Sequence, residues 1–384
     1  MPTPTPSSRH TPYRIDIPDT DLVDLRERLA RTRWPDAEPV SDWSQGIPLA
    51  YTRELAEYWR DTYDWRKTEA RLNAYDHFKV EIDGLGIHYV HARSPHEDAL
   101  PLILTHGWPG SIVEFLDVIG PLTDPTAHGG DACDAFHVVL PSLPGYGFGD
   151  KPTETGWGID RIAGAWATLM ADLGYARYGA QGGDWGSMVT AAIGRLDTDR
   201  LAGIHLNMPI AMPDAEAMRD PTPTETKALA DLATHSEWGM GYSKIQATRP
   251  QTLGYGLADS PVAQLAWIVE KFQQWTDCDG HPENVLSRDH MLDNVMLYWL
   301  TGTGASSARL YWESFRDVDL SEVPAPTGCS IFPHEIIRAS RRWAGTRFTD
   351  LRYWNELERG GHFAAFEQPE IFVEEVRRFF RLVR

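Results

Sequence analysis

The chain opens with a stretch in which apolar residues recur at the spacing of an amphipathic helix. Asp19 or Thr20 can cap this helix at its N-terminus. The apolar positions that define its buried face are Leu22, Leu25 and Leu29. A second helical pattern runs near residues 55–63. We therefore predict a helical N-terminal extension over residues 12–95.

Beyond residue 77 the helical period gives way to short runs that are typical of strands. Residues 77–94 alternate between apolar and polar positions around Asp83-Gly84, which predicts a β-hairpin. Further on, strand-like runs alternate with amphipathic stretches, one of which ends at Gly174. The runs are LPLILTHG, FHVVLPSLPGYG, TGCSIFPHE and LRYWNELERGGH. This alternation predicts an α/β domain with a mostly parallel sheet and helices on both faces.

Residues 210–320 interrupt the alternation of strands and helices. They are rich in helix-forming and aromatic residues, so we predict a helical lid inserted into the α/β core, which then comprises residues 96–209 and 321–384. Residues 1–11 are polar and rich in proline, and we predict a disordered tail there. This start lacks the apolar segment of a signal peptide.

The charge and the cysteines narrow the classes of partner. The formal net charge of the chain is −19 at pH 7. Because phosphate recognition needs clustered lysines and arginines, this charge disfavours nucleic acid and anionic membrane surfaces. No apolar run approaches the ~20 residues of a membrane span. Cys133, Cys278 and Cys329 are widely spaced, which disfavours disulfides or a structural zinc site and fits a reducing cytoplasm.

The pentapeptide Gly182-Gly183-Asp184-Trp185-Gly186 has the form of a nucleophile elbow. Its outer glycines permit a tight turn from strand to helix that exposes the central side chain. A carboxylate is anionic at neutral pH, so Asp184 can attack carbon without help from a base and form a covalent ester. The pentapeptide alone leaves an alternative open, in which Asp184 only caps a helix that begins near Ser187.

A second turn rich in glycine, His106-Gly107-Trp108-Pro109-Gly110, follows the strand run LPLILT. Such a turn presents backbone N–H groups to a developing negative charge. We predict that the N–H groups of Trp108 and Trp185 form an oxyanion hole, to which Pro109 cannot contribute because it has no N–H. A turn without catalytic duty is the alternative.

A histidine in a glycine-flanked loop lies near the C-terminus. Gly360-Gly361-His362 follows a predicted strand, and His362 is the predicted base. Glu335, at the end of a short apolar run, is the predicted acid that orients the imidazole, and Asp350 is its competitor. The order of nucleophile, acid and histidine is that of α/β hydrolases, so we predict an α/β-hydrolase fold.

Taken together, these motifs resemble the microsomal-type epoxide hydrolases from about residue 12 to the end of the chain. The stretches that carry the resemblance are HGWPGS, QGGDWGS, GYSKIQATRPQTLGYGLADSPVAQLAWIVEKFQQW, NVMLYWLTGT, PTGCSIFPHE and RGGHFAAFEQPE. The resemblance implies an enzyme that converts an epoxide to a vicinal diol and requires no organic cofactor and no metal. The interval between Glu335 and His362 also agrees with the family pattern.

The resemblance further implies roles for two lid tyrosines. Tyr242, in GYS, and Tyr311, in RLYW, match the positions of the family's pair. Opening an epoxide leaves an alkoxide, and phenolic O–H groups can donate to that oxygen and then protonate it. Without the resemblance, a lid tyrosine would more often be a packing residue, and Tyr255 and Tyr298 illustrate why the sequence alone does not single out the pair. The chain lacks the N-terminal membrane anchor of the mammalian members, which implies a soluble, bacterial-type enzyme.

The predicted reaction is hydrolysis, by water activated by His362, of an alkyl ester formed on Asp184. The expected partners are a small apolar epoxide and water, with no nucleic acid and no membrane, in the cytoplasm; a homodimer is left open. Metabolism of aromatic hydrocarbons or of secondary metabolites would supply such a substrate. A haloalkane dehalogenase with the same nucleophile is the alternative, with halide-binding N–H donors in place of paired tyrosines. An esterase is disfavoured because the elbow has no serine.

Overall fold

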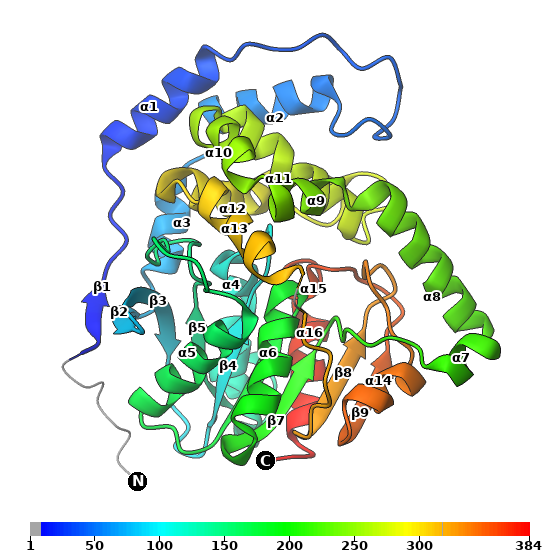
Figure 1. Ribbon diagram of the computed structural model, residues 1–384. Coiled ribbons are helices and arrows are strands. Elements are labelled where there is room, and N and C mark those ends of the chain that lie inside the picture. Colours follow the sequence, from blue (N-terminus) through cyan, green and yellow to red (C-terminus); the bar gives the residue numbers. More distant parts are fainter. Residues whose placement is uncertain (1–8, 317) are drawn as a thin grey trace.

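The computed structural model describes residues 9–316 and 318–384 (Figure 1). Within this part of the chain, the strands form one sheet in the order β1-β2-β3-β5-β4-β6-β7-β8-β9. The strands are β1 (Thr11–Tyr13), β2 (His77–Ile82), β3 (Leu85–Ala92), β4 (Leu100–Thr105), β5 (Phe136–Pro141), β6 (Tyr178–Gly182), β7 (Leu201–Leu206), β8 (Thr327–Ile331) and β9 (Leu351–Glu356). All pairs from β5 to β9 are parallel, and the pairs from β1 to β5 are antiparallel.

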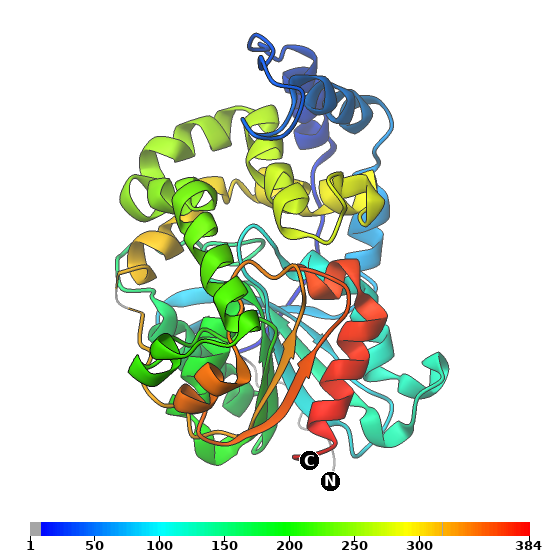
Figure 2. The same ribbon diagram turned by 90° about the vertical axis from the view of Figure 1, so that its right-hand side faces the viewer.

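Helices cover both faces of the sheet, which confirms the predicted α/β-hydrolase fold. α5 (Ile159–Asp172) and α6 (Asp184–Leu196) lie on one face, and α4 (Leu116–Thr123) and α16 (Pro369–Phe380) lie on the other (Figure 2). Strands β4 to β7 are buried almost throughout, because helices shield them on both sides. Shorter helical pieces connect these elements. They are η1 (Ile112–Phe115), η2 (Pro125–His128), η3 (Ala132–Asp134), η4 (Thr198–Arg200), α14 (Arg341–Arg347) and α15 (Ala364–Glu367).

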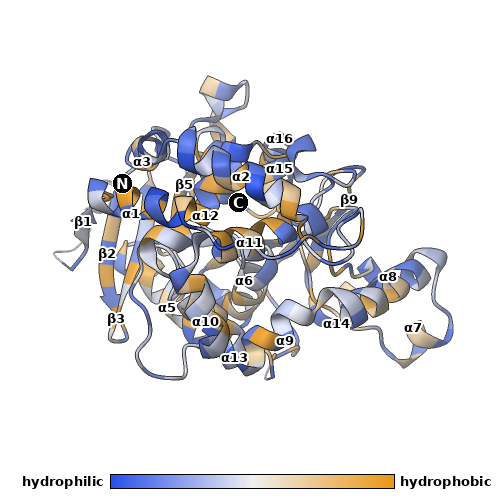
Figure 3. Ribbon diagram, turned by 90° about the horizontal axis from the view of Figure 1, so that it is seen from above, coloured by the Kyte–Doolittle hydropathy of each residue, from blue (hydrophilic) through white to orange (hydrophobic). Residues whose placement is uncertain are grey.

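The long connection between β7 and β8 is helical, and it contains the segment 210–320 for which the sequence predicts a lid. Its helices are α7 (Ala215–Arg219), α8 (Pro223–Thr234), η5 (His235–Gly239), α9 (Gly241–Thr248), α10 (Pro250–Asp259), α11 (Pro261–Trp275), η6 (Pro282–Asn284), α12 (Arg288–Thr301) and α13 (Gly304–Ser314). Seen from above, hydrophilic and hydrophobic residues alternate along these helices (Figure 3). In α11 the buried face includes Leu265, Ile268, Phe272 and Trp275, which recur at helical spacing.

The N-terminal extension contributes helices and the antiparallel edge of the sheet. Its helices α1 (Asp19–Ala30), α2 (Leu49–Asp61) and α3 (Trp65–Leu72) lie against the lid (Figure 1). The predicted hairpin forms as β2 and β3, and Asp83 and Gly84 have φ of 52° and 77°, as its tight turn requires.

The start of the chain differs from the prediction in two details. α1 begins at Asp19 after Pro18, and no side chain caps it. The predicted cap is wrong because Asp19 is already helical and pairs with Arg66. Most of the predicted tail, residues 1–8, lies outside the described residues; His10 is buried and Thr11 begins β1. None of the helices that the structure describes has the length and apolar character to cross a bilayer.

Candidate active site

The predicted nucleophile elbow forms where β6 ends and α6 begins. Asp184 is the first residue of α6 and has a φ of 51°, a strained backbone conformation for a residue with a side chain. Gly186 packs directly against the carbonyl of Thr105, and Gly182 packs against Gly186, so a Cβ at either glycine would overlap backbone. No side chain caps α6, so the reading of Asp184 as a helix cap is wrong.

The Asp184 carboxylate is held between two groups. The N–H of Trp108 donates a hydrogen bond of 2.8 Å to Oδ1. On the other oxygen, His362 Nε2 lies 3.3 Å from Oδ2. Trp108 is thus placed as the sequence predicts for one oxyanion donor. In the described structure, the backbone N–H of Trp185, the other predicted oxyanion donor, makes no hydrogen bond to the Asp184 carboxylate. The centre of the Trp185 ring lies 4.8 Å from that of the Tyr311 ring.

His362 in turn contacts Glu335, the predicted acid. Its Nδ1 donates to Glu335 Oε1 over 2.6 Å, and both side chains are buried. The N–H of Ile336 donates to the same carboxylate oxygen over 2.7 Å. The competing acid, Asp350, forms a surface ion pair with Arg352 instead. The structure therefore brings Asp184, His362 and Glu335 into one chain of contacts and leaves Asp350 out.

Opposing effects act on the proton affinity of His362. Burial lowers the pKa of the imidazole, but the negative charges of Glu335 and Asp184 and the hydrogen bonds to them outweigh burial. The result is a pKa well above the ordinary value. The two carboxyl groups therefore favour the protonated form of the imidazole.

The lid holds the loop that carries His362. The N–H of His362 donates to the carbonyl of Trp275, at the end of α11, over 2.9 Å. The N–H of Gly360 donates to Asp277 over 2.9 Å, and Glu367 accepts from the N–H of Asp277 over 2.9 Å. Hydrogen bonds on both sides of the loop thus join it to residues 275–277 of the lid.

Tyr242, in α9, and Tyr311, in α13, come together beside the elbow. The Tyr242 ring stacks on that of Trp108 with centroids 5.0 Å apart, and the two tyrosine rings are 5.8 Å apart. These two rings meet edge to face, at an interplanar angle of 79°. Burial raises the pKa of both phenols, and the negative charge of Asp184 adds to the shift. Both hydroxyls therefore stay protonated at neutral pH.

Other tyrosines of the chain are engaged elsewhere. The Tyr298 hydroxyl donates to the carbonyl of Gly110 over 2.6 Å, and the Tyr146 hydroxyl donates to that of Ser307 over 3.1 Å. Tyr255 is 71% exposed. Among the described lid tyrosines, Tyr242 and Tyr311 are buried and their rings pack against Trp108 and Trp185.

Sequence reasoning missed two buried ionisable groups near this site. Lys271, in α11, is 5% exposed and places its ammonium group 4.7 Å from the centre of the Tyr242 ring. Glu114, in η1, is 9% exposed and lies close enough to Asp184 and His362 for their charges to act on its pKa. No local motif marks either residue, because only the fold brings them to the elbow.

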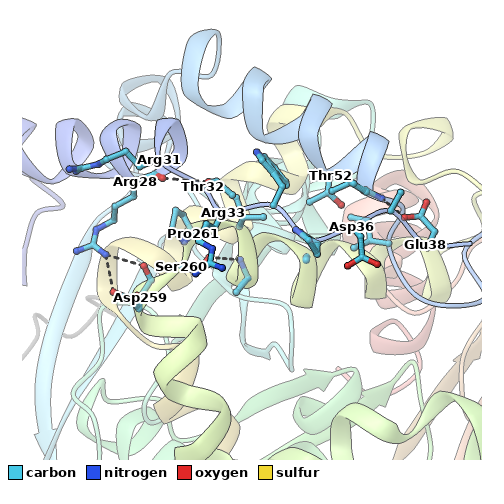
Figure 4. Close-up of a pocket in the computed structure, with 18 of the residues that line it drawn as sticks. Arg28, Arg31, Thr32, Arg33, Asp36, Glu38, Thr52, Asp259, Ser260 and Pro261 are labelled. Carbon is cyan, nitrogen blue, oxygen red and sulfur yellow. Dashed lines mark hydrogen bonds and ion pairs between the residues drawn. The ribbon is translucent and has the colours of Figure 1, made fainter.

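A large groove lies away from these residues. It has a volume of about 990 Å³ and lies between the N-terminal extension and the start of α11, where Arg28 reaches Asp259 (Figure 4). A cavity of only about 20 Å³ borders Asp184 and His362. Among the described residues, no group of three His, Cys, Asp or Glu side chains is arranged to hold a metal ion.

Known proteins resemble this chain over almost its whole length. Residues 10–115 match the epoxide hydrolase N terminus, and residues 101–257 match the alpha/beta hydrolase fold. A protein of Stigmatella aurantiaca (strain DW4/3-1) is 57% identical over 375 residues, which cover 97% of this chain and 85% of that protein. Epoxide hydrolase 1 of Sus scrofa is 34% identical over 405 residues, covering 97% of this chain and 88% of that protein.

Solved structures of epoxide hydrolases also have a similar fold. The juvenile hormone epoxide hydrolase of the silkworm Bombyx mori superposes with a TM-score of 0.89 at 32% identity, covering 98% of this chain and 96% of that one. The Aspergillus niger epoxide hydrolase gives a TM-score of 0.88 at 33% identity, covering 100% of this chain and 97% of that one. With its elbow, its lid and its N-terminal extension all matched, the chain belongs to the epoxide hydrolase family.

Proposed function

We propose that this enzyme hydrolyses a small apolar epoxide to a vicinal diol through a covalent ester on Asp184. The observation that carries the proposal is the setting of the Asp184 carboxylate. A histidine with its own acid contacts one side of it, and two buried phenols lie on the lid side. An anion that attacks carbon, donors for the leaving oxygen and a base for water are the three groups that the reaction needs.

In the first step, an Asp184 carboxylate oxygen attacks a ring carbon of the epoxide. The carbon–oxygen bond of the ring breaks, and its electron pair stays on the epoxide oxygen. Tyr242 and Tyr311 donate hydrogen bonds to that oxygen and supply its proton. Their raised pKa, caused first by burial, keeps both hydroxyls in the donor form at neutral pH.

The second step, hydrolysis of the ester, becomes possible because the first step removes the negative charge of Asp184. Esterification neutralises Asp184, and one of the two negative charges that hold the pKa of His362 high is lost. The pKa then falls, and the imidazolium proton returns to the phenol that protonated the epoxide oxygen, so neutral imidazole becomes available to take a proton from water. The water oxygen bonds to the ester carbon, and the Trp108 N–H stabilises the oxyanion. The bond to the alkyl oxygen then breaks, and this oxygen takes the proton held by His362 to release the diol.

A single turnover in heavy-oxygen water, with a racemic aryl epoxide, tests the proposal. We expect the label to enter the peptide that carries Asp184. The His362→Gln variant should accumulate an adduct whose intact mass equals protein plus epoxide, and Asp184→Ala should form none. Label that passes straight into the diol while the protein stays unlabelled would contradict the covalent route.

The alternative, a haloalkane dehalogenase, needs halide-binding N–H donors where this site has two phenols. The buried pair Tyr242 and Tyr311, with hydroxyls that stay protonated, supports the epoxide over a haloalkane. Halide release from a bromoalkane, without diol from styrene oxide, would favour the alternative.

We also propose a cytoplasmic location for the enzyme. Its oligomeric state, monomer or homodimer, is a separate question for experiment. The location is supported by three cysteines that are all unpaired, one of them, Cys133, exposed. Sedimentation at micromolar concentration distinguishes a monomer of 43.3 kDa from a dimer.

A further inference from the structure

Glu114 is a buried carboxyl group that the proposed mechanism does not use. It lies in η1, between the oxyanion turn and α4, and is 9% exposed. No lysine or arginine of the described chain forms an ion pair with it. A buried carboxyl without a counter-ion is costly unless something binds it. Its place in the molecule therefore needs an explanation.

The Glu114 carboxyl lies beside the oxyanion turn, in the same lining as the catalytic side chains. Oε1 packs against Gly110 so closely that a Cβ there would overlap it. The backbone N–H of Glu114 donates to the carbonyl of Ser111 over 3.2 Å, which fixes the residue beside the oxyanion turn, and the charges of His362 and Asp184 act on the pKa of its carboxyl. Burial raises the pKa of Glu114 to about 8, so the group is mostly protonated at neutral pH and adds no repelling charge beside Asp184.

A small cavity joins these groups. Its volume is about 20 Å³, which is room for one water molecule and too little for an epoxide. Glu114, Asp184, His362 and Asn207 all line it, so a water there has several polar partners. Neither Tyr242 nor Tyr311 lines it, which separates this cavity from the phenols that face the epoxide oxygen.

We propose that Glu114 binds the hydrolytic water in this cavity and, with His362, aims it at the ester carbon of Asp184. This inference rests on the proposed covalent function. The water donates one hydrogen to the Glu114 carboxyl and the other to His362 Nε2. His362 takes that second proton as the oxygen bonds to the Asp184 ester carbon. The alkyl oxygen leaves with its electron pair and takes that proton from His362, Asp184 then gives the remaining water proton to His362, and Glu114 ends the cycle unchanged.

Single-turnover kinetics distinguishes a role in ester hydrolysis from a role in alkylation. Alkylation is measured as the gain of adduct mass on the protein, and ester hydrolysis as its loss. In Glu114→Leu, alkylation should proceed at the wild-type rate and hydrolysis should slow by about 100-fold, since a misplaced reactant costs about that factor. Glu114→Gln keeps a carbonyl acceptor of the same shape, so its hydrolysis should stay within about fivefold of wild type.

A matched control is Glu375→Leu, which removes another buried carboxyl. Glu375 is 2% exposed, accepts from Ser330 over 2.7 Å and does not line the cavity. This variant should lose stability without any change in the hydrolysis rate constant. If Glu114→Leu fails to fold, a high-resolution crystal structure of the wild type decides, since the proposal requires a water between the Glu114 carboxyl and His362.

The outcomes are distinct. Wild-type ester hydrolysis in Glu114→Leu, or equal slowing of alkylation and hydrolysis, overturns the role of Glu114 alone, as does an empty cavity in the crystal. Absence of any adduct in His362→Gln overturns the covalent function, and the role of Glu114 falls with it.

Discussion

At the scale of single residues, the two phenols carry a clear expectation. Tyr242→Phe and Tyr311→Phe should each slow alkylation by about 10-fold to 100-fold, and the double variant by about 1,000-fold or more, because general acids contribute factors of this size. Rapid-quench mass analysis of adduct formation measures the step. Tyr255→Phe, at a 71% exposed position, is the control and should not change the rate. Normal alkylation in the double variant would remove the phenols from the mechanism.

The pH dependence of stability should reveal the buried proton of Glu114. Its folded pKa is raised by burial to about 8 from the ordinary 4.5, so the folded state binds a proton more tightly than the unfolded state. The contribution of Glu114 is fully present below pH 4.5 and is lost as the pH rises toward 8.

Glutamine at position 114 carries no such proton. Between pH 5 and pH 8, wild type should therefore lose on the order of 3 kcal/mol of unfolding free energy relative to Glu114→Gln. Urea denaturation of both proteins at the two pH values measures this. A difference that does not change with pH would show that Glu114 is not held protonated by the fold.

At the scale of elements, the contact between the His362 loop and α11 controls catalysis from outside the reacting groups. A Cβ at Gly361 would lie 2.5 Å from the carbonyl oxygen of Trp275, which accepts the His362 N–H. Gly361→Ala should push the loop from the lid and lower kcat by about 100-fold, since displacement of a base by about 1 Å has that effect. Steady-state kinetics measures it.

The control for that variant is Gly345→Ala in α14. A Cβ at Gly345 meets nothing within 4 Å, and alanine favours a helix over glycine. Its kcat should equal that of wild type. Unchanged kcat in Gly361→Ala would mean that the loop tolerates displacement from α11.

At the scale of the whole molecule, the N-terminal extension is docked to the lid through a buried carboxylate. Asp293, in α12, is 3% exposed and accepts from the hydroxyl of Tyr63 over 2.7 Å and from that of Thr68. Tyr63→Phe should lower the unfolding free energy by roughly 1–2 kcal/mol, because a buried acceptor loses a donor. Catalysis should remain, since none of these residues contacts Asp184.

Tyr58 provides the comparison for Tyr63. Its hydroxyl donates to Asp289 over 2.8 Å at a half-buried position of the same interface. Solvent can replace that donor, so Tyr58→Phe should cost less than Tyr63→Phe in urea denaturation. If the two variants lose the same unfolding free energy, the burial of Asp293 does not determine how much the hydrogen bond from Tyr63 stabilises the protein.

Local patterns in the sequence were sufficient for the features that local physics controls. The hairpin at Asp83-Gly84, the alternation of strands and helices, and the elbow glycines all follow from neighbouring residues, because backbone conformation and periodicity act over short distances. The prediction for the start of α1 failed in detail, since Asp19 pairs with Arg66 and does not cap the helix.

By itself, then, the sequence determined the order of elements, the kind of nucleophile and the family resemblance. Only the tertiary structure decided which groups meet. It placed Glu335 beside His362 and Asp350 on the surface, engaged Tyr298 with Gly110, and turned Glu114 toward the elbow. The physical reason is that these contacts join residues from different strands, loops and helices, and their burial and charge exist only once those elements pack together.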